Sequence, residues 1–87
     1  MPDRSDILEE HIRMTTLRLL VDRTAYRLRW TPLDRQEAIE LIEETRDEVL
    51  ELFPDKGEVF ELVLRPRFMR FLDERALVEW GLADAMN

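Results

Sequence analysis

After Pro2, the first third of the sequence contains no glycine or proline before Pro32, so nothing in it forces a helix to end once begun. Asp3 or Ser5 is suited to accept hydrogen bonds from the first free backbone amides of such a helix. The sequence therefore predicts one long helix over residues 4–29.

Apolar residues recur at helical spacing in this first segment, but they point in more than one direction. One stripe comprises Leu8, Ile12, Thr15, Leu19 and Tyr26, and a neighbouring stripe comprises Met14, Leu17, Val21, Ala25 and Leu28. Together with Leu20 they make an apolar surface wider than the single stripe of a surface helix. We therefore expect this helix to be central or to pack on a second copy of the chain, with a homodimer interface at Leu17, Leu20 and Val21.

The second helix is predicted over residues 32–53. Thr31 followed by Pro32 matches a helix cap followed by proline at the first helical position. Pro32 also disfavours helical geometry at Thr31, which places the end of the first helix there. Pro54 ends the second helix after Phe53, and a turn follows.

The third segment, residues 57–80, has a less regular pattern. Residues 58–64 favour a strand by propensity, but a single strand without a partner in the chain is unstable, so we predict helix. Pro66 lies inside this helix and must kink or split it. Gly81 is suited to end it, and residues 83–87 are expected to fray.

These elements predict an all-α, three-helix antiparallel bundle formed by residues 1–87 as one domain. Such a bundle is thin for its length. We therefore expect homodimerisation to complete it, with a symmetric interface as the commonest form.

Composition limits what the chain can do. The formal net charge of −7 argues against generic binding to nucleic acid or to anionic membranes, which require basic surface. Cysteine is absent, histidine occurs once and serine only at Ser5, which excludes thiol chemistry and leaves no plausible catalytic triad. We predict no catalytic residue, metal or cofactor. No apolar run is long enough for a membrane span or signal peptide, which favours a cytoplasmic location.

Most of the negative charge belongs to one segment. Residues 32–58 contain ten acidic and three basic residues. The simplest interpretation is a solvated helix face, and the alternative is a docking surface for a basic partner protein. Candidate partner-binding residues are Glu37, Glu40, Glu44, Asp47, Glu48 and Glu51, together with Phe68 and Phe71 if these two form an exposed apolar stripe.

Arg65, Arg67 and Arg70 form a basic cluster around Pro66. If a helix begins at Pro66, its free amides add positive potential, and an anion such as phosphate or a carboxylate can bind there. Alternatively the arginines pair with acids one turn away, as Arg65 would with Glu61.

The sequence thus favours a small acidic interaction or regulatory module that is not an enzyme and acts through protein–protein contacts. The alternative is a small dimeric enzyme or a bundle that binds an anion or dicarboxylate through Arg and Glu. The first predicted helix contains five arginines: Arg13, Arg18, Arg23, Arg27 and Arg29. In size, helix count and arginine content the chain resembles the helical dimers of the chorismate-mutase family. The family also uses a lysine after its first helix, a position where this chain offers only arginine.

Overall fold

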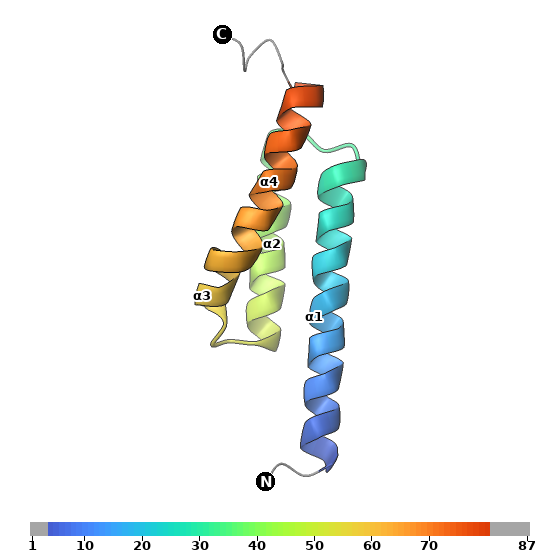
Figure 1. The fold of residues 1–87 in the computed structure, drawn as a ribbon, viewed down its shortest axis with the longest axis vertical. Coiled ribbons are helices and arrows are strands. Elements are labelled where there is room, and N and C mark those ends of the chain that lie inside the picture. The colour runs from blue at the N-terminus through green and yellow to red at the C-terminus, as the bar shows by residue number, and fades with distance from the viewer. Residues whose placement is uncertain (1–3, 81–87) are drawn as a thin grey trace.

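A computed structural model describes residues 4–80, and that part of the chain folds into three antiparallel helical segments without a strand (Figure 1). The first two segments are α1 (Arg4–Trp30) and α2 (Arg35–Leu52). The third is continuous through α3 (Gly57–Val59), η1 (Phe60–Leu64), α4 (Arg65–Arg75) and η2 (Ala76–Trp80). The predicted all-α three-helix fold is confirmed, and residues 58–64 are helical. The predicted end at Gly81 and the frayed tail at residues 83–87 lie outside the described residues.

The first helix is longer than the bundle that it belongs to. Its 27 residues span about 40 Å at 1.5 Å per residue, whereas α2 has 18 residues. Figure 1 shows the N-terminal part of α1 extending well past the turn that joins α2 to α3. The bundle therefore covers the C-terminal part of α1, and within residues 4–80 no other helix lies beside its beginning.

One apolar core joins the three segments. It consists of Leu28 from α1, four residues of α2 and three of the third segment, all at most 4% exposed: Leu28, Ala38, Leu41, Ile42, Val49, Phe60, Phe68 and Leu72. The rings of Phe60 and Phe68 lie 6.3 Å apart between centroids, at an angle of 56°. A tilted arrangement of this kind brings the positive edge of one ring towards the negative face of the other.

The second helix begins three residues later than predicted, at Arg35. Its cap is Asp34, whose carboxylate accepts from the Glu37 backbone N–H at 2.8 Å, while the Glu37 side chain accepts from the Asp34 N–H. This capping box satisfies two free amides reciprocally. Thr31 instead belongs to the end of α1, where its hydroxyl donates to the Arg27 carbonyl at 2.6 Å.

Pro66 is accommodated by a widened turn. Proline lacks an N–H, and in a regular α-helix its ring would clash with the carbonyl of residue 62. The backbone relieves this in η1, where the N–H of Arg65 donates to the carbonyl of Phe60 five residues earlier. The helix therefore runs through Pro66 without a break, and the distortion predicted there is a π-helical turn.

Candidate interaction surface

The side of α1 that faces away from the core is apolar. Thr24 and Leu28 are fully buried and mark the inner side of the helix. At about 100° per residue, a second set of apolar side chains points roughly 120–160° away from Thr24. We call this set the outer face of α1: Leu8 59%, Ile12 55%, Leu19 64%, Tyr26 62% and Trp30 65% exposed.

Contacts with α2 fix this orientation. The hydroxyls of Thr24 and Thr45 lie 2.6 Å apart in the core, and Thr45 donates to the Leu41 carbonyl at 2.8 Å. On the surface, one guanidinium nitrogen of Arg23 contacts both carboxylate oxygens of Glu48, at 2.9 and 3.2 Å. Because these contacts hold α1 at one rotation about its axis, the outer face must point away from the bundle.

The interface predicted from sequence lies on a different side. Leu17 and Val21 are half-buried and pack against the core of their own chain, and Leu20 is half-buried as well. Contacts within the bundle therefore already use much of their apolar surface. The predicted dimer interface at these residues is untested, but the four most exposed apolar side chains of α1 all lie on the outer face.

The projecting beginning of α1 has the same polarity as the rest of the helix. Asp6, Glu10 and Arg13 continue the direction of the inner side, while Leu8 and Ile12 continue the outer face. Ile7, 58% exposed, lies between the two sides. A segment that extended the core of its own chain would show the reverse arrangement, with apolar residues on the inner side.

A shorter apolar patch occurs on the third segment, where Val59, Leu62 and Val63 are 47%, 69% and 57% exposed. These residues occupy about one turn, whereas the outer face of α1 extends over six turns. The outer face is therefore the larger candidate surface in the part of the chain described.

Of the predicted anion site at Arg65, Arg67 and Arg70, the last two side chains are exposed, whereas Arg65 is engaged within the fold. Arg65 donates to Glu43 of α2 at 2.7 Å and to Glu61 of η1 at 2.6 Å. Its guanidinium also lies 5.5 Å from the centre of the Phe60 ring. Since the helix does not begin at Pro66, no free amides gather near the cluster, and Arg65 is already committed to two carboxylates.

Electrostatics support this assignment of Arg65. The hydrogen bond from Arg65 is the largest effect on the Glu61 carboxyl and lowers its pKa below the ordinary value; burial opposes this, and the hydrogen bond from Arg46 lowers the pKa further. Hydrogen bonds to Glu43 and Glu61 raise the pKa of Arg65 further above its usual range. Arg46 also donates to Glu61 at 2.9 Å, so the four side chains connect α2 to the third segment. This cluster has a structural role.

The acidic residues of α2 divide into two groups. Glu37 caps the helix and Glu48 pairs with Arg23, so both serve the fold. The other four predicted partner-binding acids are exposed, and the structure assigns them no salt bridge among residues 4–80: Glu40, Glu44, Asp47 and Glu51. They form an acidic ridge on the solvent side of α2.

The apolar stripe predicted on the third segment is absent as a surface. Phe68 is fully buried in the core, so it cannot contact a partner, and that prediction is corrected. Phe71 is half-buried and packs against the core. Spacing alone could not distinguish these two aromatic residues from an exposed stripe, because inner and outer stripes of a helix have the same period.

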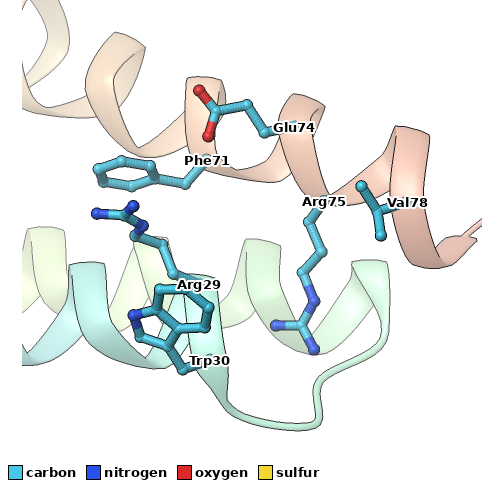
Figure 2. A pocket seen from close by; sticks show the side chains of 6 residues that line it. All are labelled: Arg29, Trp30, Phe71, Glu74, Arg75 and Val78. Atoms are coloured by element: carbon cyan, nitrogen blue, oxygen red, sulfur yellow. The ribbon is translucent and has the colours of Figure 1, made fainter.

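Figure 2 shows the pocket between the end of α1 and α4. The guanidinium of Arg29 lies between two rings, 5.4 Å from the centre of Trp30 and 5.1 Å from that of Phe71. Arg75, which is buried, donates to the Leu28 carbonyl at 3.0 Å. Residue 32, which would donate to that carbonyl in a longer helix, is proline, so Arg75 supplies the missing hydrogen bond.

The cavities are small for a substrate. The pocket at Arg29 has a volume of about 230 Å³. An apolar groove between α1 and α3, bordered by Met14 and Val59, has about 220 Å³. Both fall below the roughly 300–1,000 Å³ typical of small-molecule sites. A third, shallow hollow of about 320 Å³ beside Glu9, Ile12 and Arg13 of α1 only just reaches that range. Among the described residues no three acids or histidines come together to hold a metal ion, and no helix is long and apolar enough to cross a membrane.

The spacing of the outer face was visible in the sequence, except for Trp30. Leu8, Ile12, Leu19 and Tyr26 form one of the two predicted stripes. What the sequence could not show is which stripe the bundle would bury. Comparison with family models, curated proteins and solved structures found no match to this chain.

Proposed function

We propose that this chain is a helical protein-interaction module, not an enzyme, and that its binding surface is the outer face of α1. The observation that carries the proposal is the exposure of Leu8, Ile12, Leu19, Tyr26 and Trp30, all more than half accessible and all on one side of a rigidly held helix. An extended apolar stripe of this kind is typical of a surface that packs against another helix.

The rest of the molecule supports this role. Thr24 and Thr45 fix the rotation of α1, and the cluster around Arg65 joins α2 to the third segment. The bundle thereby acts as a scaffold that presents the outer face in one orientation. Surfaces held on rigid elements lose less entropy when they bind.

The acidic ridge of α2 is a second candidate surface. Glu44, Asp47 and Glu51 lie on the solvent side of α2. The helix α2 also contacts α1, but the outer face belongs to α1, so a basic partner can bind these acids without covering that face. We keep this as a secondary proposal, because an exposed acidic helix face is also common in proteins that bind nothing there.

The alternative of an enzyme or a dicarboxylate-binding bundle has less support. Arg65 is held by Glu43 and Glu61, and Arg23 by Glu48, so these arginines are already paired. Arg29 lies between two aromatic rings in a pocket smaller than most substrate sites.

A photoreactive phenylalanine analogue placed at position 19 tests the proposal in cells that produce the protein naturally. Asp73, an exposed helical position on α4, is the matched control site. We expect a covalent adduct of defined mass from position 19, lost when Ile12→Glu is added, and none from position 73. The absence of any adduct specific to position 19 would contradict the proposal.

A further inference from the structure

We propose that the partner bound by the outer face of α1 is a second copy of the same chain, with the two α1 helices antiparallel. This inference rests on the proposed function and specifies the partner. It differs from the interface predicted at Leu17, Leu20 and Val21, which lies on the side of α1 already packed against its own bundle.

The geometry leaves the outer face accessible to another bundle. From Leu8 to Trp30 the outer face extends for roughly 33 Å along the helix. Because the core lies on the opposite side of α1, two chains that meet through their outer faces keep α2 and α4 away from most of the contact, and only the Trp30 end lies beside α4, at the pocket shared with Phe71 and Val78. The projecting beginning of α1 then lies beside the other chain's α1 instead of in water.

The available area reaches what a specific dimer needs. A buried tyrosine or tryptophan removes about 150–250 Å² from water, and a leucine or isoleucine about 60–120 Å². At the exposed fractions of Leu8, Ile12, Leu19, Tyr26 and Trp30, each chain offers about 400 Å² of apolar surface. With the polar share usual in homodimers the two chains bury about 1,200 Å², the lower limit of a specific interface.

The charges of α1 select a second copy and an antiparallel orientation. Residues 4–16 contain three acids and two arginines, a net charge of −1, whereas residues 17–30 contain four arginines and one aspartate, a net charge of +3. In an antiparallel pair the acidic half of each helix lies beside the basic half of the other. A parallel pair would place the two basic halves together, and like charges in contact disfavour association.

Individual side chains agree with this orientation. If the two-fold axis passes near Leu19, the apolar layers pair Ile12 with Tyr26 and Leu8 with Trp30, each from opposite chains. A two-fold axis brings each flank of the stripe against the same flank of the other chain. Glu9 then lies near Arg27 of the second copy on one flank.

The first experiment measures the mass of the purified full-length chain by sedimentation equilibrium across the micromolar range. We expect a dimer that Leu19→Glu weakens by more than about 100-fold, because each dimer then buries two unpaired carboxylates. Leu62→Glu is the matched control, since Leu62 is a leucine of similar exposure, 69% against 64%, outside α1. It should leave the dimer intact, and circular dichroism should show unchanged helix content in both variants.

Cysteine cross-linking tests the orientation. The sequence contains no native cysteine, so any disulfide must join introduced cysteines. In the antiparallel pair Leu19→Cys lies near the axis and forms a disulfide with its own copy under mild oxidation. The two Leu8→Cys positions lie roughly 33 Å apart and cannot do so. Mixing Leu8→Cys with Trp30→Cys should restore cross-linking. Self-cross-linking of Leu8→Cys would overturn the antiparallel orientation.

A chain that stays monomeric at high micromolar concentration overturns the inference, as does a dimer insensitive to Leu19→Glu. The proposed function fails on a different observation, the lack of any position-19 adduct in cells. A monomer whose position 19 cross-links to another protein would therefore refute self-association while leaving the outer face as a binding surface.

Discussion

The buried pair of Thr24 and Thr45 gives a sharp prediction about what holds α1 in place. Each hydroxyl has one proton, and that of Thr45 goes to the Leu41 carbonyl at 2.8 Å. Thr24 must therefore be the donor in the 2.6 Å contact between the hydroxyls. Both residues are fully buried, so neither hydroxyl can turn to water instead.

Valine matches threonine in shape, which makes the substitutions nearly free of packing changes. Thr24→Val removes one hydrogen bond and should lower the free energy of unfolding by about 1 kcal/mol. Thr45→Val leaves the Thr24 hydroxyl buried without its acceptor and should cost about 1–2 kcal/mol, reduced if that hydroxyl turns to the carbonyl of its own helix four residues earlier. The double variant buries two apolar groups with no polar atom left unpaired, so it should lie within about 0.5 kcal/mol of the wild type.

Urea unfolding followed by circular dichroism measures all four proteins. We place the cycle in the Leu19→Glu background, because association would make the apparent stability depend on protein concentration. For a domain of this size, 1 kcal/mol corresponds to a shift of about 4–8 °C in Tm, well within reach of the measurement. A double variant that costs the sum of the two single variants would refute the argument, since it would mean that the hydroxyls contribute independently.

Three further predictions concern the contacts that shape the scaffold. Asp34→Ala removes the capping box and should lower the free energy of unfolding by about 1 kcal/mol in urea, with Asp34→Asn costing less. Because Arg65 lowers the pKa of Glu61 in the folded state, their contact stabilises the fold above the unfolded pKa of that carboxyl and is lost as pH falls below it. The Tm difference between wild type and Glu61→Gln should therefore shrink in acid. Arg75→Met should cost roughly 1.5–3 kcal/mol, because the Leu28 carbonyl then loses a charged donor; an unchanged urea midpoint would exclude that role.

Local patterns predicted the fold class and the three segments, but competing local signals were harder to rank. Both Thr31-Pro32 and Asp34 with Glu37 are valid helix starts by residue type. The structure uses the second: Asp34 and Glu37 form a capping box, and the Thr31 hydroxyl donates instead to a carbonyl at the end of α1. Choosing between such signals requires knowing at which residue the preceding helix ends.

The partners of the arginine side chains could not be predicted from sequence spacing, because several of them lie on other helices. Arg65 pairs with Glu61 one turn away, as the sequence indicated, but also with Glu43, 22 residues earlier on another helix. Arg29 lies over the ring of Phe71 on α4, and Arg13 lies over the ring of Phe53, the residue directly after α2. Guanidinium groups bind both carboxylates and aromatic faces, so a list of arginines cannot show which are committed within the fold.

The first helix shows why an apolar stripe is easier to detect than to assign. Thr24 and Leu28 point to the core, while Leu19 and Tyr26 point away from it, so the apolar residues of α1 nearly surround the helix over its covered part. A helix with two apolar sides is stabilised by burying both, and residues 4–80 provide helices for only one of them. The second side must therefore be covered from outside the chain, or remain exposed at a cost in solubility. The first half of α1 has a net charge of −1 and the second half +3. A second copy of α1 in the opposite direction therefore matches these charges and could cover the exposed side without any other protein.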